Sequence, residues 1–261
     1  MEKTADEART RLYLRDAFRH IAAQAALPVI ALALWHVSVT WFDVPEWQIP
    51  SPPAIIKAMG ADFRAILPHL ITTYGNVLVG FTMAAAIGIA LAIAIYFNAS
   101  VGIAVTPFIN LMCIMPLITL VPLLMLWLGF GSKAKLVAVV IQSFPIINLN
   151  ALSAFAGVNP LRLELMESMK ATKYQKMRCC ILPDSLPGIF TGVKLAAVLA
   201  LTAEVTSEIT GGNAGLGARI IQYTQYMKMP QAFACVFYIA AFGLIFYQSL
   251  SFIERKLTKN Y

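Results

Sequence analysis

Long apolar stretches alternate with short polar segments along most of the chain. Windows rich in Leu, Ile, Val, Ala and Phe predict six helices, at about 21–42, 70–97, 103–128, 135–156, 187–210 and 230–253. A helix needs about 20 mostly apolar residues to cross a hydrocarbon core of about 30 Å. The pattern therefore predicts an all-α integral membrane protein with six transmembrane helices, forming one domain over residues 21–253.

Prolines interrupt the third of these windows, at Pro107, Pro116 and Pro122. Because proline breaks or kinks a helix, this window predicts two helical pieces joined by a bend. Prolines at membrane depth are tolerated where neighbouring helices or water satisfy the freed backbone groups. The pattern therefore favours a packed bundle of helices over a single membrane anchor.

Composition supports a membrane protein. Of the 261 residues, 59% are hydrophobic and only 13% are charged, whereas a soluble domain carries about a quarter charged residues. The net charge of +7 does not indicate nucleic-acid binding, because basic and aromatic residues are not interleaved and membrane proteins collect Lys and Arg in cytoplasmic loops. The four cysteines lack the spacing of metal ligands, so no metal site is predicted.

The distribution of Lys and Arg predicts the orientation in the membrane. Thirteen of these residues fall in the arm 1–20, the segment 157–186 and the tail 254–261, and six fall in the loops on the other side. Under the positive-inside rule, both termini and 157–186 are therefore expected to be cytoplasmic. In the arm 1–20, an apolar stripe at helical spacing with interleaved arginines predicts an amphipathic helix lying on the inner leaflet, and a frayed basic tail is the alternative.

The segment 157–186 is a basic island between apolar helices. Pro160 suits the first turn of one helix and Thr172 suits the N-cap of a second. We expect Pro183 and Pro187 to end that second helix and begin the next span. The expected apolar face of the first helix comprises Leu163, Met166 and Met169. Such a helix–turn–helix on the bilayer surface suits protein docking, and a solvated connecting loop is the alternative.

The stretch ELMESMKATKYQKMRCCILPDSLPGIFTGVKLA resembles the EAA loop of the permeases of ATP-binding-cassette (ABC) importers. Glu164, Leu182 and Pro183 keep that pattern, and Lys170 stands where the family has its turn glycine. Stretches at 49–59, 115–131, 144–158 and 206–217 resemble the nitrate/sulfonate/taurine branch of the same family. The resemblance implies that the segment couples the chain to an ATPase through Glu164, Glu167, Lys170, Ala171, Thr172, Leu182 and Pro183.

The resemblance also implies a fold and a set of partners. It implies the type I importer permease fold, in a bacterial cytoplasmic membrane, with a second permease subunit that is either identical or different. Two cytosolic ABC ATPase subunits would bind ATP and Mg²⁺, and an external binding protein would deliver a small polar or anionic solute. The chain itself is expected to hold no cofactor and to catalyse no reaction.

Polar residues inside the spans are candidates for function, since they are costly in lipid. Glu204 and Glu208 lie four residues apart on one helix face, and either line the translocation path or brace an external gate. Gln142 and Asn148 either contact the solute or hold helices together by hydrogen bonds. Lys194 is expected to reach the inner membrane interface.

Two other functions compete with the permease interpretation. A self-sufficient secondary transporter could use Glu204 and Glu208 as a proton relay, although no internal repeat supports it. A membrane enzyme would need a catalytic constellation, and the scattered His20, His36 and His69 form none. The Gly-rich loop 211–220 is no phosphate loop, because it lacks the Lys-Ser/Thr ending, and it is expected to turn the chain sharply between two spans.

Overall fold

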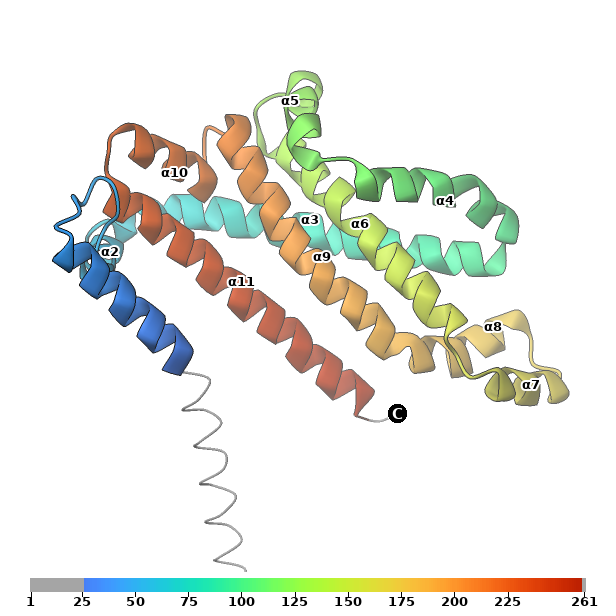
Figure 1. Ribbon diagram of the computed structural model, residues 1–261. Helices are drawn as coiled ribbons and strands as arrows, with labels where there is room; N and C mark the ends of the chain where they lie inside the picture. The colour runs from blue at the N-terminus through green and yellow to red at the C-terminus, as the bar shows by residue number, and fades with distance from the viewer. Residues whose placement is uncertain (1–25, 260–261) are drawn as a thin grey trace, which may run out of the picture.

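The structure is a computed structural model that describes residues 26–259, and every regular element in this range is helical (Figure 1). A first helix spans Ala26–Trp41. The others are α2 (Pro52–Ala61), α3 (Phe63–Phe97), α4 (Ala99–Ile114), α5 (Leu117–Leu128), α6 (Ser132–Ala156), α7 (Pro160–Ser168), α8 (Lys173–Lys176), the π-helix η1 (Met177–Ile181), α9 (Leu182–Gly211), α10 (Leu216–Gln225) and α11 (Met229–Thr258). The predicted amphipathic arm 1–20 lies outside the described residues.

Four helices are long and apolar enough to cross a membrane: α3, α6, the continuous helix Lys173–Gly211, and α11. They contain the spans predicted at 70–97, 135–156, 187–210 and 230–253. The bent pair α4–α5 raises the number to five if it counts as one span. The helix Ala26–Trp41 is apolar and, over the described residues, shorter than these four, so the six-span count stays a prediction.

The predicted break in the third window is confirmed. Helices α4 and α5 meet at an angle of 104°, and Met115 and Pro116 form the extended link between them. Pro116 is the N-cap of α5, where its missing N–H costs nothing. The other two prolines, Pro107 and Pro122, lie inside the helices without ending them.

The expectation that Pro183 and Pro187 separate two helices is wrong. The chain stays helical from Lys173 to Gly211, passing through the π-helix Met177–Ile181 directly before Pro183. A proline in a helix lacks a hydrogen-bonding N–H and crowds the carbonyl four residues earlier. A wider π turn at this point relieves that clash, so the chain stays helical through both prolines.

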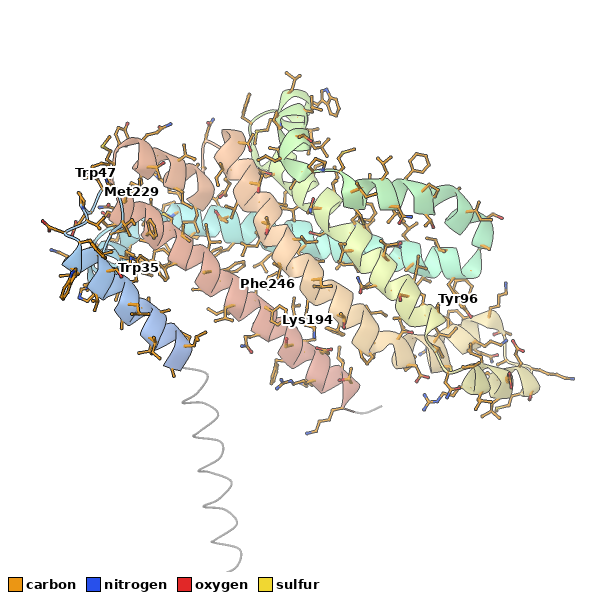
Figure 2. The ribbon with its side chains drawn as sticks, viewed as in Figure 1. Trp35, Trp47, Tyr96, Lys194, Met229 and Phe246 are labelled. Carbon is orange, nitrogen blue, oxygen red and sulfur yellow. The ribbon has the colours of Figure 1, made fainter. Side chains whose placement is uncertain are left out.

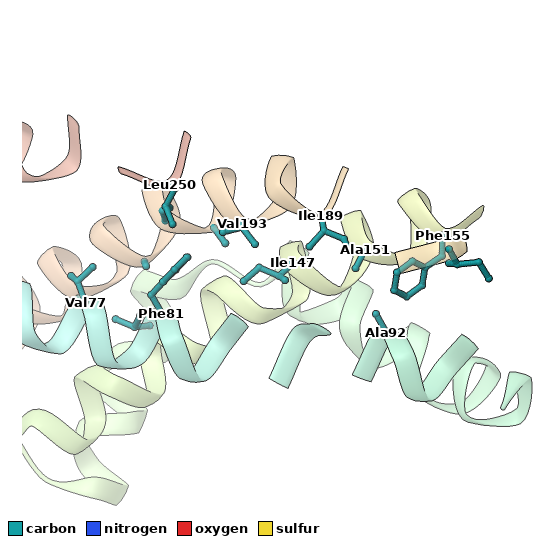
Figure 3. Packing of buried hydrophobic residues seen from close by; sticks show 14 of the residues in the cluster. Val77, Phe81, Ala92, Ile147, Ala151, Phe155, Ile189, Val193 and Leu250 are labelled. Atoms are coloured by element: carbon teal, nitrogen blue, oxygen red, sulfur yellow. The ribbon is translucent and has the colours of Figure 1, made fainter. Parts of the chain in front are cut away.

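The core lies where α3, α6 and α9 pack against one another, with α11 on the flank (Figure 3). Small residues let these helices approach closely, as is usual in membrane bundles. A Cβ at Gly88 of α3 would stand 2.8 Å from the Phe144 carbonyl oxygen of α6, and one at Gly192 of α9 would stand 2.5 Å from the Asn150 Cβ. The α6 helix is thereby fixed against both neighbours.

Aromatic side chains hold α11 against α3. The rings of Tyr74 and Phe242 stack with centroids 3.9 Å apart. Phe81 meets Phe246, which Figure 2 labels on α11, edge to face at 5.0 Å. Nearer the C-terminal end of α11, Lys194 of α9 is paired within the protein and does not extend unpaired to the membrane interface. Its Nζ donates to Glu254 Oε2 at 2.7 Å. Aromatic and charged contacts therefore join α11 to the core helices along its length.

Candidate functional site

The segment 157–186 forms a helix, a tight turn and the start of a second helix, which is the helix–turn–helix predicted from the sequence. Asn159 caps α7, with Pro160 in the first turn. Thr172 caps α8 through a capping box with Gln175, in which each side chain bonds the other residue's backbone. In Figure 1, α7 and α8 lie at one end of the molecule and α10 lies at the other.

Lys170 takes the backbone conformation that the family pattern assigns to glycine. Its φ is +54°, in the left-handed region that side chains other than glycine rarely adopt. The Ala171 N–H donates to the Met166 carbonyl at 2.9 Å, and the Lys170 N–H donates to the Glu167 carbonyl at 2.8 Å. The turn therefore keeps its shape without glycine, at a cost of about 1–2 kcal/mol for the lysine.

The apolar side chains of α7 divide between two faces, which corrects the single face expected at Leu163, Met166 and Met169. Leu163 and Met166 pack against the core, whereas Met169 is 71% exposed. Leu161 and Leu165 are also exposed, at 69% and 61%. Because residues four apart share a helix face, Leu161 and Leu165 form an outward stripe that leads to Met169. We call these three residues the α7 stripe.

Two ion pairs fix α7 to the rest of the chain. Lys176 Nζ lies 2.6 Å from Glu167 Oε1, and Arg162 Nη1 lies 2.5 Å from Asp184 Oδ1. Of the remaining coupling candidates, Glu164 and Thr172 are exposed, while Ala171, Leu182 and Pro183 are partly buried. The side chain of Glu164 is thus accessible beside the α7 stripe, whereas Leu182 and Pro183 belong to the packed start of α9.

Glu208 lies in a buried polar cluster at the far end of α9. Its Oε2 accepts from the Gly217 N–H at 2.8 Å, and its Oε1 accepts from the Thr73 hydroxyl at 2.8 Å. Thr73 in turn accepts from the Leu216 N–H at 2.9 Å. The carboxylate therefore satisfies the free N–H groups at the start of α10, where a negative charge is favourable.

A buried lysine neutralises this carboxylate. Lys135 of α6 is only 2% exposed, and its Nζ lies 3.7 Å from Glu208 Oε1. The same Nζ donates to the Ala214 carbonyl at 2.5 Å. Helices α3, α6, α9 and the loop before α10 thus meet at one buried ion pair.

The Gly-rich loop folds closely around the Glu208 side chain. Gly215 has φ +115°, and a Cβ there would stand 1.7 Å from Glu208 Oε1. The backbone N–H of the same residue donates to His69 Nδ1 at 3.0 Å. The loop turns the chain as predicted, and it also encloses a carboxylate, which the sequence did not indicate.

Glu204 lies one turn earlier on α9 and is fully buried. Its Oε1 accepts from Asn76 Nδ2 at 2.8 Å, while Oε2 has no hydrogen-bond partner among residues 26–259. The sequence did not indicate the partners of these two carboxylates, which are Asn76 for Glu204 and Thr73 and Lys135 for Glu208. Their signal was weak: two polar residues three apart on an apolar helix, and a lysine assigned to a loop.

The amide candidates of α6 differ in environment. Asn148 is fully buried, and its Nδ2 donates to the Gly88 carbonyl at 3.0 Å. This bond crosses from α6 to α3 at Gly88, where the two helices approach closely, which is how an amide holds membrane helices together. Gln142 is partly buried. The geometry therefore supports a packing role for Asn148.

Comparison with known proteins identifies the family. Residues 84–259 match the model of the binding-protein-dependent transport system inner membrane component. The chain is 26% identical over 230 residues to the formylaminopyrimidine transport permease ThiX of Halalkalibacterium halodurans, covering 88% of this chain and 92% of that one. It is 24% identical over 235 residues to the putative aliphatic sulfonates transport permease SsuC of Bacillus subtilis, covering 89% and 85%.

A third relative covers nearly the whole chain. The riboflavin transport system permease RibX of Chloroflexus aurantiacus is 28% identical over 265 residues, covering 99% of this chain and 98% of that one. Among solved structures, the inward-facing MetNI methionine ABC transporter superposes with a TM-score of 0.60 at 21% identity, covering 77% and 97%. The fold is that of an ABC importer permease, and the chain belongs to the inner-membrane permease components of binding-protein-dependent ABC transport systems, in their nitrate/sulfonate/taurine-like branch.

Proposed function

We propose that the chain forms, with a second identical or different permease subunit, the translocation path of an ATP-driven importer. The family is a transport component and not catalytic, and ATP hydrolysis belongs to the partner ATPase. The proposal adds that two ATPase subunits dock on residues 157–186 from the cytosol. An external binding protein delivers a small polar or anionic solute at the opposite end, near α10.

The α7 stripe carries the docking part of the proposal. Three large apolar side chains, each more than 60% exposed, follow one another on a short helix next to the accessible carboxylate of Glu164. Such an exposed apolar patch with polar neighbours suits burial in a groove of another protein. The ion pairs from α7 to α8 and α9 fix the helix in position, which reduces the entropy lost on docking.

The relatives support the solute class. The names of the matched proteins give aliphatic sulfonates, formylaminopyrimidine and riboflavin as their solutes. All are small and polar, and the sulfonates are anions. We extend this class to the present chain as nitrate, sulfonate, taurine, pyrimidine-like or aromatic carboxylate solutes.

The alternative of a secondary transporter driven through Glu204 and Glu208 has less support. Family membership assigns transport to a binding-protein-dependent system. In addition, both oxygens of Glu208 already bond to Thr73 and Gly217, which suits bracing of the outer end better than carrying a solute or proton.

Co-purification with the ATPase tests the docking surface. The full-length chain, expressed with the ABC ATPase encoded beside it, is expected to retain that ATPase in mild detergent. Leu165→Asp is expected to lose most of it, because a charge on the α7 stripe must be desolvated in the groove, and Glu164→Ala is expected to weaken it. Leu257→Asp, on the exposed end of α11, is the matched control and is expected to bind normally. Equal retention by Leu165→Asp and wild type would show that α7 is not the contact.

A further inference from the structure

A polar cavity of about 400 Å³ opens beside the start of α10. It is lined by His69, Gly212, Asn213, Ala218, Arg219 and Gln222. This volume lies within the range of small-molecule sites. None of the lining residues is acidic, whereas a second cavity at the same end of the molecule, between α2 and the start of α11, is lined by two acidic residues, Glu46 and Asp62, and one basic residue, Lys57.

Arg219 supplies the charge of this cavity. Among residues 26–259 no carboxylate lies within ion-pair distance of its guanidinium. Its Nε lies 2.7 Å from His69 Nε2, and its Nη1 donates to Gln222 Oε1. Because His69 Nδ1 already accepts from the Gly215 N–H, the imidazole is not an imidazolium, and the arginine is the cation that faces the cavity.

The contacts of Arg219 leave hydrogen-bond donors directed to a ligand. Gln222 Oε1 accepts from Nη1, so the guanidinium is oriented while its charge stays unneutralised by any carboxylate among residues 26–259. The Gln222 amide uses its oxygen towards Arg219, which leaves its NH₂ group free to donate. The Asn213 side chain is exposed at the same opening. A planar guanidinium with adjacent amide donors is suited to a sulfonate or carboxylate group.

We propose that this cavity is an oxyanion subsite, which holds the sulfonate or carboxylate group of the solute at the outer mouth before translocation. The inference rests on the proposed function, because it takes α10 to face the solute-binding protein. Arg219 pairs with the oxyanion, and Asn213 and Gln222 donate to it. Glu208 and Lys135 hold the loop that carries Asn213, and they do not contact the solute.

Thiol labelling with charged reagents tests the subsite directly. In a full-length background in which the exposed Cys113 and Cys179 are serine, Asn213→Cys is placed in phosphatidylcholine nanodiscs. An anionic sulfonatoethyl methanethiosulfonate and a cationic trimethylammonium reagent are compared, each normalised to its rate with a free thiol. We expect the anion to react about tenfold faster, since a cation a few ångströms away attracts one reagent and repels the other.

Variants of Arg219 and a matched cysteine in another cavity test whether Arg219 causes the preference for the anionic reagent. Arg219→Gln is expected to bring the rate ratio close to one, and Arg219→Lys to keep most of the preference. Should Arg219→Gln fail to fold, Gln222→Glu neutralises the guanidinium in place and is expected to have the same effect. Ala54→Cys, in the cavity that contains acidic residues, is expected to show no anion preference and no response to Arg219→Gln.

Competition identifies the source of the oxyanion. Millimolar methanesulfonate is expected to slow the labelling of Asn213→Cys with the wild-type arginine and not with Arg219→Gln. The proposal is overturned if the rate ratio is unchanged by Arg219→Gln. It is also overturned if phosphatidylglycerol protects the thiol and methanesulfonate does not, because the site would then bind a lipid headgroup. Labelling does not depend on the ATPase, so this result stands apart from the co-purification.

Discussion

Replacing Glu208 with glutamine removes one negative charge from the buried cluster near the C-terminal end of α9 while keeping the shape of the side chain. The variant leaves Lys135, which is 2% exposed, without its counter-ion. It also turns one acceptor oxygen into an NH₂ donor. That donor faces either the Gly217 N–H or the Thr73 hydroxyl, both of which now donate to the carboxylate.

The distance between Lys135 and Glu208 gives the expected loss of stability. At 3.7 Å, two unit charges attract by about 4 kcal/mol at an effective dielectric constant of 20. Removing one partner of a buried pair costs about 3–5 kcal/mol, which includes the unpaired lysine. For a chain of this length, each kcal/mol lowers the melting temperature by about 2–4 °C. We expect Glu208→Gln to melt roughly 10 °C below wild type.

The assay is a double-mutant cycle in detergent, followed by intrinsic fluorescence during heating at a fixed rate. Lys135→Met alone is expected to lower the melting temperature as well, because it leaves the carboxylate buried without a cation. The double variant is expected to be more stable than the sum of the two single losses predicts, since it contains no unpaired charge. Its hydrogen bonds to Gly217 and Thr73 stay compromised, so it does not reach wild type.

Two results would refute this reasoning. A melting temperature of Glu208→Gln within about 2 °C of wild type would mean that the carboxylate does not stabilise the start of α10. Additive losses in the double variant would mean that Lys135 and Glu208 do not interact, and the 3.7 Å separation would then carry no energetic weight. Solute uptake is measured with the same variants. If Glu208 braces the start of α10, uptake and thermal stability are expected to fall together.

Four further substitutions test the turn, the helix packing and the ion pair between α9 and α11. Lys170→Gly is expected to stabilise the chain by about 0.5 kcal/mol, since relief of the left-handed backbone exceeds the entropy lost by glycine; unchanged or lower thermal stability would contradict it. Gly192→Val is expected to cost about 1–3 kcal/mol by overpacking against α6, while Gly75→Ala, with open space around its Cβ, is expected to raise thermal stability slightly. Lys194→Met is expected to lower the free energy of unfolding by no more than about 1 kcal/mol, because the ion pair of Lys194 with Glu254 is partly exposed. A larger decrease, measured by thermal unfolding, would mean that the pair is shielded from water.

The apolar pattern was sufficient to locate the helices in which burial in lipid dominates. The spans around α3, α6, α9 and α11 were predicted because their apolar runs are long and lipid-facing side chains need no polar cover. The bend between α4 and α5 was predicted because proline has a local mechanism. The continuity of the helix through Pro183 was not, since a π turn depends on backbone register that residue types do not display.

Contacts between distant segments limited what could be predicted of the candidate sites. Glu208 was recognised as a buried acidic residue, but its partners Thr73 and Gly217 lie on other elements. Lys135 was assigned to a loop because a lysine next to a helix start usually faces water, whereas here it points into the bundle. The two faces of α7 were also beyond the sequence, because a short apolar helix does not show which side the core covers.

The continuous helix Lys173–Gly211 connects the two candidate sites mechanically. At about 1.5 Å per residue its 39 residues span about 59 Å, with the capped turn of Thr172 at one end and the carboxylate of Glu208 near the other. Had Pro183 broken this helix, as the sequence suggested, the two ends could have moved independently. Under the proposed function, a tilt imposed on α8 by the ATPase instead displaces Glu208 and the start of α10, which it holds through hydrogen bonds. Weakening these hydrogen bonds, as in Glu208→Gln, is therefore expected to leave binding of the ATPase intact. It is expected to make ATP hydrolysis depend less on the solute-binding protein.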